Sequence, residues 1–129
     1  MADHVEKTIL IIEDNIDFLN VLKDRLEMNG YQIIFENNGL TGLQTAKREI
    51  PDLILLDLML PGINGHVVCR ILKYDSKLKH IPIIILTSRD TDEDIALAKK
   101  CLADMFVLKT VRFEILLGIT KKMLNEKNK

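Results

Sequence analysis

The sequence predicts an α/β fold in which a five-stranded parallel sheet is doubly wound, with helices on both of its faces. Short β-rich runs alternate with longer amphipathic stretches along the whole chain, and five such pairs in succession are typical of this architecture. Right-handed crossovers then place helices on both sides of the sheet. Three runs are continuously apolar, as expected for strands covered on both faces: Ile9–Ile12, Leu53–Leu56 and Ile83–Leu86.

Five segments are predicted to be strands. In chain order they are Thr8–Ile12, Gln32–Glu36, Leu53–Asp57, Ile83–Thr87 and Met105–Leu108. The second has polar residues at both ends, which favours an edge position, whereas the third has the most central character.

Between the strands, apolar residues recur with the spacing of an amphipathic helix. Asn29-Gly30 is expected to end the first helix, and Thr91 or Asp90 is expected to cap the fourth. The five apolar faces contain Phe18, Leu19, Leu22 and Leu26; Leu40, Leu43 and Ala46; Val67, Val68, Ile71 and Leu72; Ile95, Ala98 and Cys101; and Phe113, Leu116, Leu117, Met123 and Leu124.

Length and composition indicate a single domain over residues 1–129, with a core of about residues 7–125. The chain is 47% hydrophobic and 29% charged with a net charge of −1, which gives no reason to expect direct contact with nucleic acid or a membrane. Cys69 and Cys101 lack metal-binding spacing. They are predicted to be small core residues, which favours a reducing, cytoplasmic location.

Polar residues end four of the predicted strands, and parallel strands bring their carboxyl ends to one edge of the sheet. Taken singly, each has an ordinary explanation as a helix cap, a turn residue, a strand-ending hydroxyl or a surface lysine. Their joint placement predicts a functional site instead. The residues are Glu13 and Asp14 after the first strand, Asp57 after the third, Thr87 at the end of the fourth and Lys109 after the fifth.

These residue types suit phosphoryl transfer. Carboxylates held close together repel one another unless a cation joins them, and oxygen ligands suit Mg²⁺. An aspartate such as Asp57 can attack phosphorus and form an aspartyl phosphate. The hydroxyl of Thr87 and the ammonium of Lys109 can bind the phosphoryl oxygens.

Four segments resemble the receiver domains of response regulators: Ile9–Asn15, Leu53–Gly65, Ile83–Ser88 and Asp104–Lys109. The resemblance covers about residues 7–125. It implies the flavodoxin-like strand order 2-1-3-4-5 and a phosphorylation-dependent switch of two-component signalling. The implied phosphodonor is a histidine kinase or a phosphotransfer protein of a phosphorelay.

The resemblance also implies a role for each site residue. Glu13 and Asp14 match the acidic pair that holds Mg²⁺, together with Asp57 and the backbone carbonyl of Met59. Asp57 matches the phosphoacceptor.

The implied output depends on the hydroxyl of Thr87, which moves to the phosphoryl group, while Lys109 pairs with that group. The ring of Phe106 then turns inward and reshapes the face formed by the fourth helix, fifth strand and fifth helix. Partners implied by this change are an output domain or protein, or a phosphorylation-linked homodimer. An ordinary core role for Phe106 stays open.

Three positions depart from expectation. Thr110 stands where receivers commonly carry a cis proline, so the Lys109–Thr110 peptide is predicted to be trans. Leu102 stands where glycine is usual, and because a left-handed leucine costs about 1–2 kcal/mol, the loop is expected to take another course. Gly118 interrupts the fifth helix, for which close packing is the only explanation suggested.

Two other functions remain open. No enzymatic activity is expected beyond the chain's own phosphorylation and dephosphorylation. A small Mg²⁺-dependent phosphohydrolase could use Asp57, although Met59 stands where a second carboxylate would be needed. A phosphorylation-independent interaction module that keeps only the fold is the other alternative, and Thr110 and Leu102 keep it open.

Overall fold

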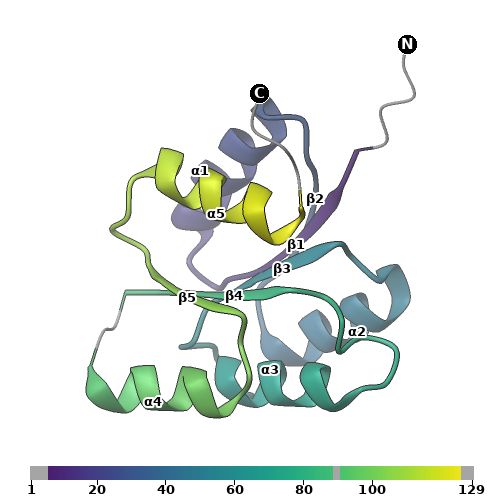
Figure 1. Cartoon of the computed structure of the whole chain (residues 1–129), viewed down its shortest axis with the longest axis vertical. Coiled ribbons are helices and arrows are strands. Elements are labelled where there is room, and N and C mark those ends of the chain that lie inside the picture. The colour runs from purple at the N-terminus through teal and green to yellow at the C-terminus, as the bar shows by residue number, and fades with distance from the viewer. Residues whose placement is uncertain (1–5, 89–90, 126–129) are drawn as a thin grey trace.

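The computed structural model describes residues 6–88 and 91–125, and they form one parallel sheet between two layers of helices (Figure 1). The strand order β2-β1-β3-β4-β5 is the predicted flavodoxin-like order, with β2 at an edge and β3 in the centre. The predicted strands are confirmed, except that the third ends one residue early. They are β1 (Thr8–Ile12), β2 (Gln32–Glu36), β3 (Leu53–Leu56), β4 (Ile83–Thr87) and β5 (Met105–Leu108).

Five helices alternate with the strands and confirm the doubly wound prediction. Helices α1 and α5 cover one face of the sheet, and α2, α3 and α4 cover the other (Figure 1). Among the described residues, no helix is both long and apolar enough to cross a membrane. The helices are α1 (Ile16–Met28), α2 (Gly39–Glu49), α3 (Gly65–Tyr74), α4 (Asp92–Lys100) and α5 (Phe113–Met123).

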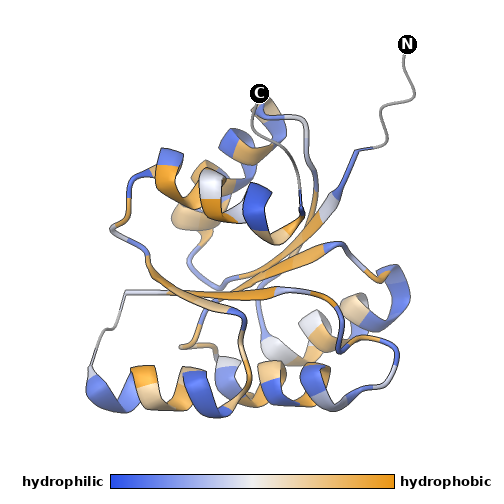
Figure 2. Ribbon diagram, viewed as in Figure 1, coloured by the Kyte–Doolittle hydropathy of each residue, from blue (hydrophilic) through white to orange (hydrophobic). Residues whose placement is uncertain are grey.

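The central strand β3 explains why the core lies on both sides of the sheet. Ile54 and Leu56 pack into the cluster under α2, α3 and α4, whereas Leu53 and Leu55 pack into the cluster under α1 and α5. Figure 2 shows the same apolar character along the middle of the sheet. Each fully buried leucine or isoleucine contributes about 1.5–3 kcal/mol. Asp57, the next residue, is therefore the first polar group at the end of a wholly apolar strand.

Side-chain caps fix where three helices begin, directly after the carboxyl ends of strands or the loops that follow them. Asn15 Oδ1 accepts a hydrogen bond from the Phe18 amide at 3.1 Å, and Asn38 Oδ1 accepts one from Thr41 at 2.9 Å. Thr91 caps α4 as predicted. Its alternative, Asp90, lies outside the described residues.

Two expectations, one about the turn before β5 and one about α5, are wrong. Leu102 does adopt a left-handed backbone conformation, with φ of 68°, because the chain must turn sharply between the end of α4 and Asp104, whose amide bonds the Ile83 carbonyl at 2.9 Å. A Cβ built on Gly118 would meet no atom within 4 Å, so close packing does not explain this glycine. The described peptide bonds are all trans, which confirms the prediction for Lys109–Thr110.

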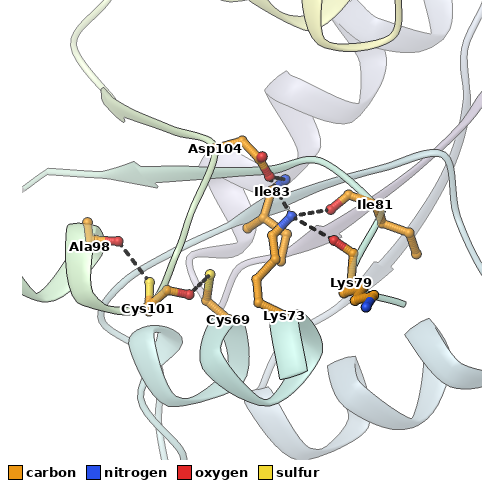
Figure 3. A network of polar contacts seen from close by, with 8 residues as sticks. All are labelled: Cys69, Lys73, Lys79, Ile81, Ile83, Ala98, Cys101 and Asp104. Atoms are coloured by element: carbon orange, nitrogen blue, oxygen red, sulfur yellow. Dashed lines mark hydrogen bonds and ion pairs between the residues drawn. The ribbon is translucent and has the colours of Figure 1, made fainter. Parts of the chain in front are cut away.

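A closed polar network ties the amino ends of β4 and β5 to α3 (Figure 3). Lys73 Nζ lies 2.6 Å from Asp104 Oδ2 and donates to the Ile81 carbonyl at 2.8 Å. Beside it, the free thiols of Cys69 and Cys101 are both buried, which confirms their core role. Hydrogen bonding to Cys101 and burial raise the pKa of Cys69, so this thiol stays protonated.

Candidate functional site

Three carboxylates meet at the carboxyl ends of β1 and β3, which are neighbours in the sheet. One oxygen from each of Glu13, Asp14 and Asp57 lies within 4.8 Å of the others. Glu13 is only 2% exposed and Asp57 only 6%, whereas Asp14 faces solvent. A donor set made only of carboxylate oxygens, open on one side, fits a hard divalent cation such as Mg²⁺.

Asp57 is held in place by the backbone around it. Its amide donates to the Ile12 carbonyl at 3.0 Å, and its Oδ1 accepts from the Met59 amide at 3.3 Å. Burial, and then the neighbouring charge of Glu13, raise the pKa of Asp57 to about 6, although Lys109 acts in the opposite direction. The carboxylate is therefore ionised at neutral pH but more basic than an ordinary aspartate.

Lys109 reaches this cluster from the end of β5. Its amide donates to the Thr87 carbonyl at 2.8 Å, which fixes the start of the side chain. Its Nζ lies 2.7 Å from Glu13 Oε1 and 3.5 Å from Asp57 Oδ2. One ammonium thus neutralises part of the charge of three carboxylates, and a negative surplus remains.

Thr87 and Phe106 lie on the same face of the sheet. In the parallel register Phe106 is opposite Ile85, and Thr87 is two residues beyond Ile85, which returns it to the same face. Thr87 is completely buried, whereas Phe106 is half-buried against the cluster under α2, α3 and α4. Phe106 also lines a depression of ≈ 560 Å³ beside the edge strand β5. The side chain of Thr87 is therefore on the same face as the ring of Phe106, and that ring has free space beside it.

Gly65 supports the site in a way that the sequence did not indicate. A Cβ at this position would collide with the Asp57 carbonyl and lie 2.8 Å from the Leu58 Cα. Its amide donates to the Leu58 carbonyl at 2.9 Å. The start of α3 can approach the Asp57 segment this closely only because Gly65 has no side chain.

Phe18 also contributes to the site, although the apolar periodicity of the sequence predicted only a core role for it. Lys109 Nζ lies 4.7 Å from the centre of its ring. The available signal was its position, four residues after Asp14 on the first turn of α1. The structure thus joins Glu13, Asp14, Asp57 and Lys109 directly, with Met59 bonded to Asp57 through its amide.

Known proteins match this chain along most of its length. The family model of the response regulator receiver domain matches residues 9–121. Protein PilH of Pseudomonas aeruginosa is 36% identical over 116 residues, which make up 90% of this chain and 96% of that protein.

Solved structures of receiver domains have the same fold as this chain. The signal receiver domain of a signal transduction histidine kinase from Syntrophus aciditrophicus has a TM-score of 0.88 and 34% identity, covering 92% of this chain and 90% of that one. The BeF3-activated N-terminal receiver domain of Klebsiella pneumoniae RstA has a TM-score of 0.83 and 30% identity, covering 92% and 99%. With its fold and the matched residues 9–121, the chain belongs to the response regulator receiver domain family of two-component signalling.

Proposed function

We propose that this chain is a phosphorylation-dependent switch whose Asp57 accepts a phosphoryl group from a histidine kinase or a phosphotransfer protein. The observation that carries the proposal is the cluster of Glu13, Asp14 and Asp57 with Lys109 at the carboxyl ends of the strands. Membership of the receiver family supports it. Two-component phosphotransfer and the two free thiols favour a cytoplasmic location.

Mg²⁺ is the proposed cofactor, held by the carboxylates of Glu13, Asp14 and Asp57 and by the backbone carbonyl of Met59. When bound, the ion supplies positive charge that offsets the carboxylates and the phosphoryl oxygens. The surplus of negative charge around one ammonium favours this binding.

Transfer begins with a carboxylate oxygen of Asp57, which attacks the phosphorus of the donor. A phosphorus–oxygen bond forms, and the phosphorus–nitrogen bond of a phosphohistidine breaks, with its electron pair left on the imidazole nitrogen. Although burial and Glu13 raise the pKa of Asp57 to about 6, the carboxylate is ionised at neutral pH and so can act as the nucleophile. Lys109 and Thr87 then donate to the phosphoryl oxygens.

The output proposed is a change of the surface formed by α4, β5 and α5. Thr87 moves toward the phosphoryl group, and the half-buried ring of Phe106 takes up the space it leaves. A shift of this kind needs only a few kcal/mol of differential contact. The altered surface would bind an output domain or protein, or a second copy of the chain. No catalysis is proposed beyond self-phosphorylation and dephosphorylation.

The test is the intact mass of the protein after incubation with acetyl phosphate and Mg²⁺. Wild type should gain one phosphoryl group, and Asp57→Asn or a chelator should abolish the gain. Asp52→Asn is the matched control because Asp52 precedes the same strand and binds the Thr8 amide at 2.7 Å, away from the cluster.

Other outcomes identify the alternatives. A folded wild-type protein with neither an adduct nor a stable beryllofluoride complex would be a phosphorylation-independent interaction module. Continuous release of phosphate with many turnovers, lost in Asp57→Asn, would indicate a phosphohydrolase.

A further inference from the structure

We infer that Phe18 is a positioning residue that holds the ammonium of Lys109 during phosphoryl transfer to Asp57; the inference rests on the proposed function. Lys109 Nζ lies 4.7 Å from the centre of the Phe18 ring, within the range of a cation–π contact. The same nitrogen lies 2.7 Å from Glu13 Oε1 and 3.5 Å from Asp57 Oδ2. The ring is therefore part of the immediate surroundings of the ammonium.

The ring of Phe18 is itself fixed. The backbone amide of Phe18 donates to Asn15 Oδ1 at 3.1 Å, and this hydrogen bond fixes the first turn of α1. The side chain packs against the cluster under α1 and α5. The amide of Asn15 in turn donates to Glu13 Oε2 at 3.0 Å, so the ring and the carboxylate that binds Lys109 belong to one connected segment.

Lys109 needs such a support because its stem is long and flexible. Its backbone is fixed by a hydrogen bond from its amide to the Thr87 carbonyl at 2.8 Å, but this bond does not fix the ammonium at the far end of the stem. During transfer the ammonium must exchange carboxylate oxygens for phosphoryl oxygens on Asp57. The contact with the ring involves none of these oxygens, so it can persist through the exchange and keep the ammonium near the reacting group.

The same groove contains a natural control. Between α1 and α5 lies an apolar groove of ≈ 180 Å³ that both Phe18 and Phe113 line. Phe113 is also half-buried, and the guanidinium of Arg25 lies 5.4 Å from its ring centre. Arg25, however, has no contact with the carboxylate cluster among the ion pairs of the described residues. Loss of either ring should disturb packing, but only loss of Phe18 should disturb Lys109.

The experiment compares Phe18→Leu with Phe113→Leu in the whole 129-residue chain, using acetyl phosphate and Mg²⁺. Phe18→Leu should lower the maximal rate of acyl-phosphate formation by about five- to tenfold, since cation–π contacts of partly buried groups have this strength. The half-saturating acetyl phosphate concentration should stay the same. Phe113→Leu should keep the wild-type rate, although both variants should lose similar stability.

Fluorinated phenylalanine separates the charge effect from packing. Successive fluorine atoms weaken the negative face of the ring while changing its shape little. At position 18 the rate should fall stepwise with fluorination, whereas at position 113 it should not change. In parallel, the NMR shifts of the Lys109 side-chain protons should lose their ring-current contribution in Phe18→Leu.

The outcomes are distinct for the two proposals. If wild type forms no acyl phosphate and no beryllofluoride complex, the proposed function and the role of Phe18 are both overturned. If wild type is phosphorylated but fluorination at position 18 leaves the rate unchanged, only the positioning role is overturned. Equal rate losses in Phe18→Leu and Phe113→Leu would also overturn it, because packing would then explain both.

Discussion

Lys109 and Lys73 are both largely buried and lie at opposite ends of the strands of one sheet, yet their charges are balanced differently. Lys73 Nζ lies 2.6 Å from Asp104 Oδ2 and donates to the carbonyls of Ile81 and Lys79 at 2.8 and 3.2 Å. An ammonium has three donors, so these three acceptors complete its bonding (Figure 3). One carboxylate therefore balances one ammonium, and the pair carries no surplus charge.

At the other end, Lys109 faces an excess of acceptors. Its Nζ lies 2.7 Å from Glu13 Oε1 and 3.5 Å from Asp57 Oδ2, and Asp14 adds a third carboxylate to the cluster. Ion pairs of the same chemical type therefore serve two purposes in this fold. The balanced pair of Lys73 stabilises the contact between α3, β4 and β5, whereas the unbalanced cluster is the proposed site for a cation and a phosphoryl group.

The largest difference should appear in the transfer rate when each lysine is replaced by methionine. Lys109→Met should slow acyl-phosphate formation by about a hundredfold or more, because a donor to the developing charge is lost. Lys73→Met should leave the rate near that of wild type at a temperature where the variant is folded. Initial rates from intact mass with acetyl phosphate and Mg²⁺ would measure this. Similar losses in both variants would contradict the separation of roles.

Asp57→Asn should stabilise the metal-free protein at alkaline pH. The pKa of Asp57 rises from its ordinary 3.8 to about 6 on folding, so the folded state holds the proton more tightly than the unfolded chain. Stability is therefore lost as the pH rises through the interval between these values. At pH of about 8, in chelator, the variant should exceed wild type by about 2–3 kcal/mol.

Urea unfolding at several pH values would measure that difference. The gain should disappear below pH of about 4, where wild-type Asp57 is protonated in both states. Asp52→Asn, at the other end of the strand, should show no such gain at alkaline pH. A constant difference between Asp57→Asn and wild type at all pH values would contradict the electrostatic origin.

Lys73→Met should lower the free energy of unfolding by about 2 kcal/mol. Removing one partner of a buried pair costs about 3–5 kcal/mol, but the side chain of Asp104 is 38% exposed, so water offsets part of the loss. Lys23→Met is the matched control, since Lys23 pairs with Glu27 at 3.2 Å on the surface of α1. Its effect in the same denaturation experiment should stay below about 0.5 kcal/mol; equal effects would show that the Lys73 network adds no special stability.

The Lys109 cluster at the carboxyl ends of the strands and the Lys73 pair at their amino ends were not equally predictable from the sequence. The residues at the carboxyl ends of the strands could be predicted because apolar runs mark buried strands. The polar residues that follow these runs, such as Asp57 and Lys109, must then lie together at one edge of the sheet. The strand order itself came from the family resemblance. The pairing of Lys73 with Asp104 has no comparable signal, because it depends on how a loop and a helix meet in three dimensions.

Some details at the functional end were also beyond local patterns. Apolar periodicity correctly placed Phe18 on the inner face of α1, but not under the ammonium of Lys109. The close approach at Gly65 depends on the angle at which α3 meets the backbone of Asp57. For Leu102, the intrinsic cost of a left-handed leucine suggested another loop path, yet the tertiary position of Asp104 prevailed.

Leu102→Gly should give the smallest effect and tests whether the two ends act independently. Leucine at φ of 68° is strained by about 1–2 kcal/mol, and glycine removes this strain at the cost of a more flexible unfolded chain. The free energy of unfolding should therefore rise by about 0.5–1 kcal/mol. Leu102→Ala, which keeps the Cβ and its strain, should give no gain.

The transfer rate of Leu102→Gly decides what this gain means. Leu102 belongs to the loop that positions Asp104 beside Lys73. Relief of its backbone strain should therefore stabilise the amino ends of β4 and β5, where this ion pair lies. It should leave acyl-phosphate formation at Asp57 unchanged. A faster or slower transfer would show that the turn between α4 and β5 passes strain along β5 to Lys109, so that the left-handed leucine is part of the switch rather than a local cost of the fold.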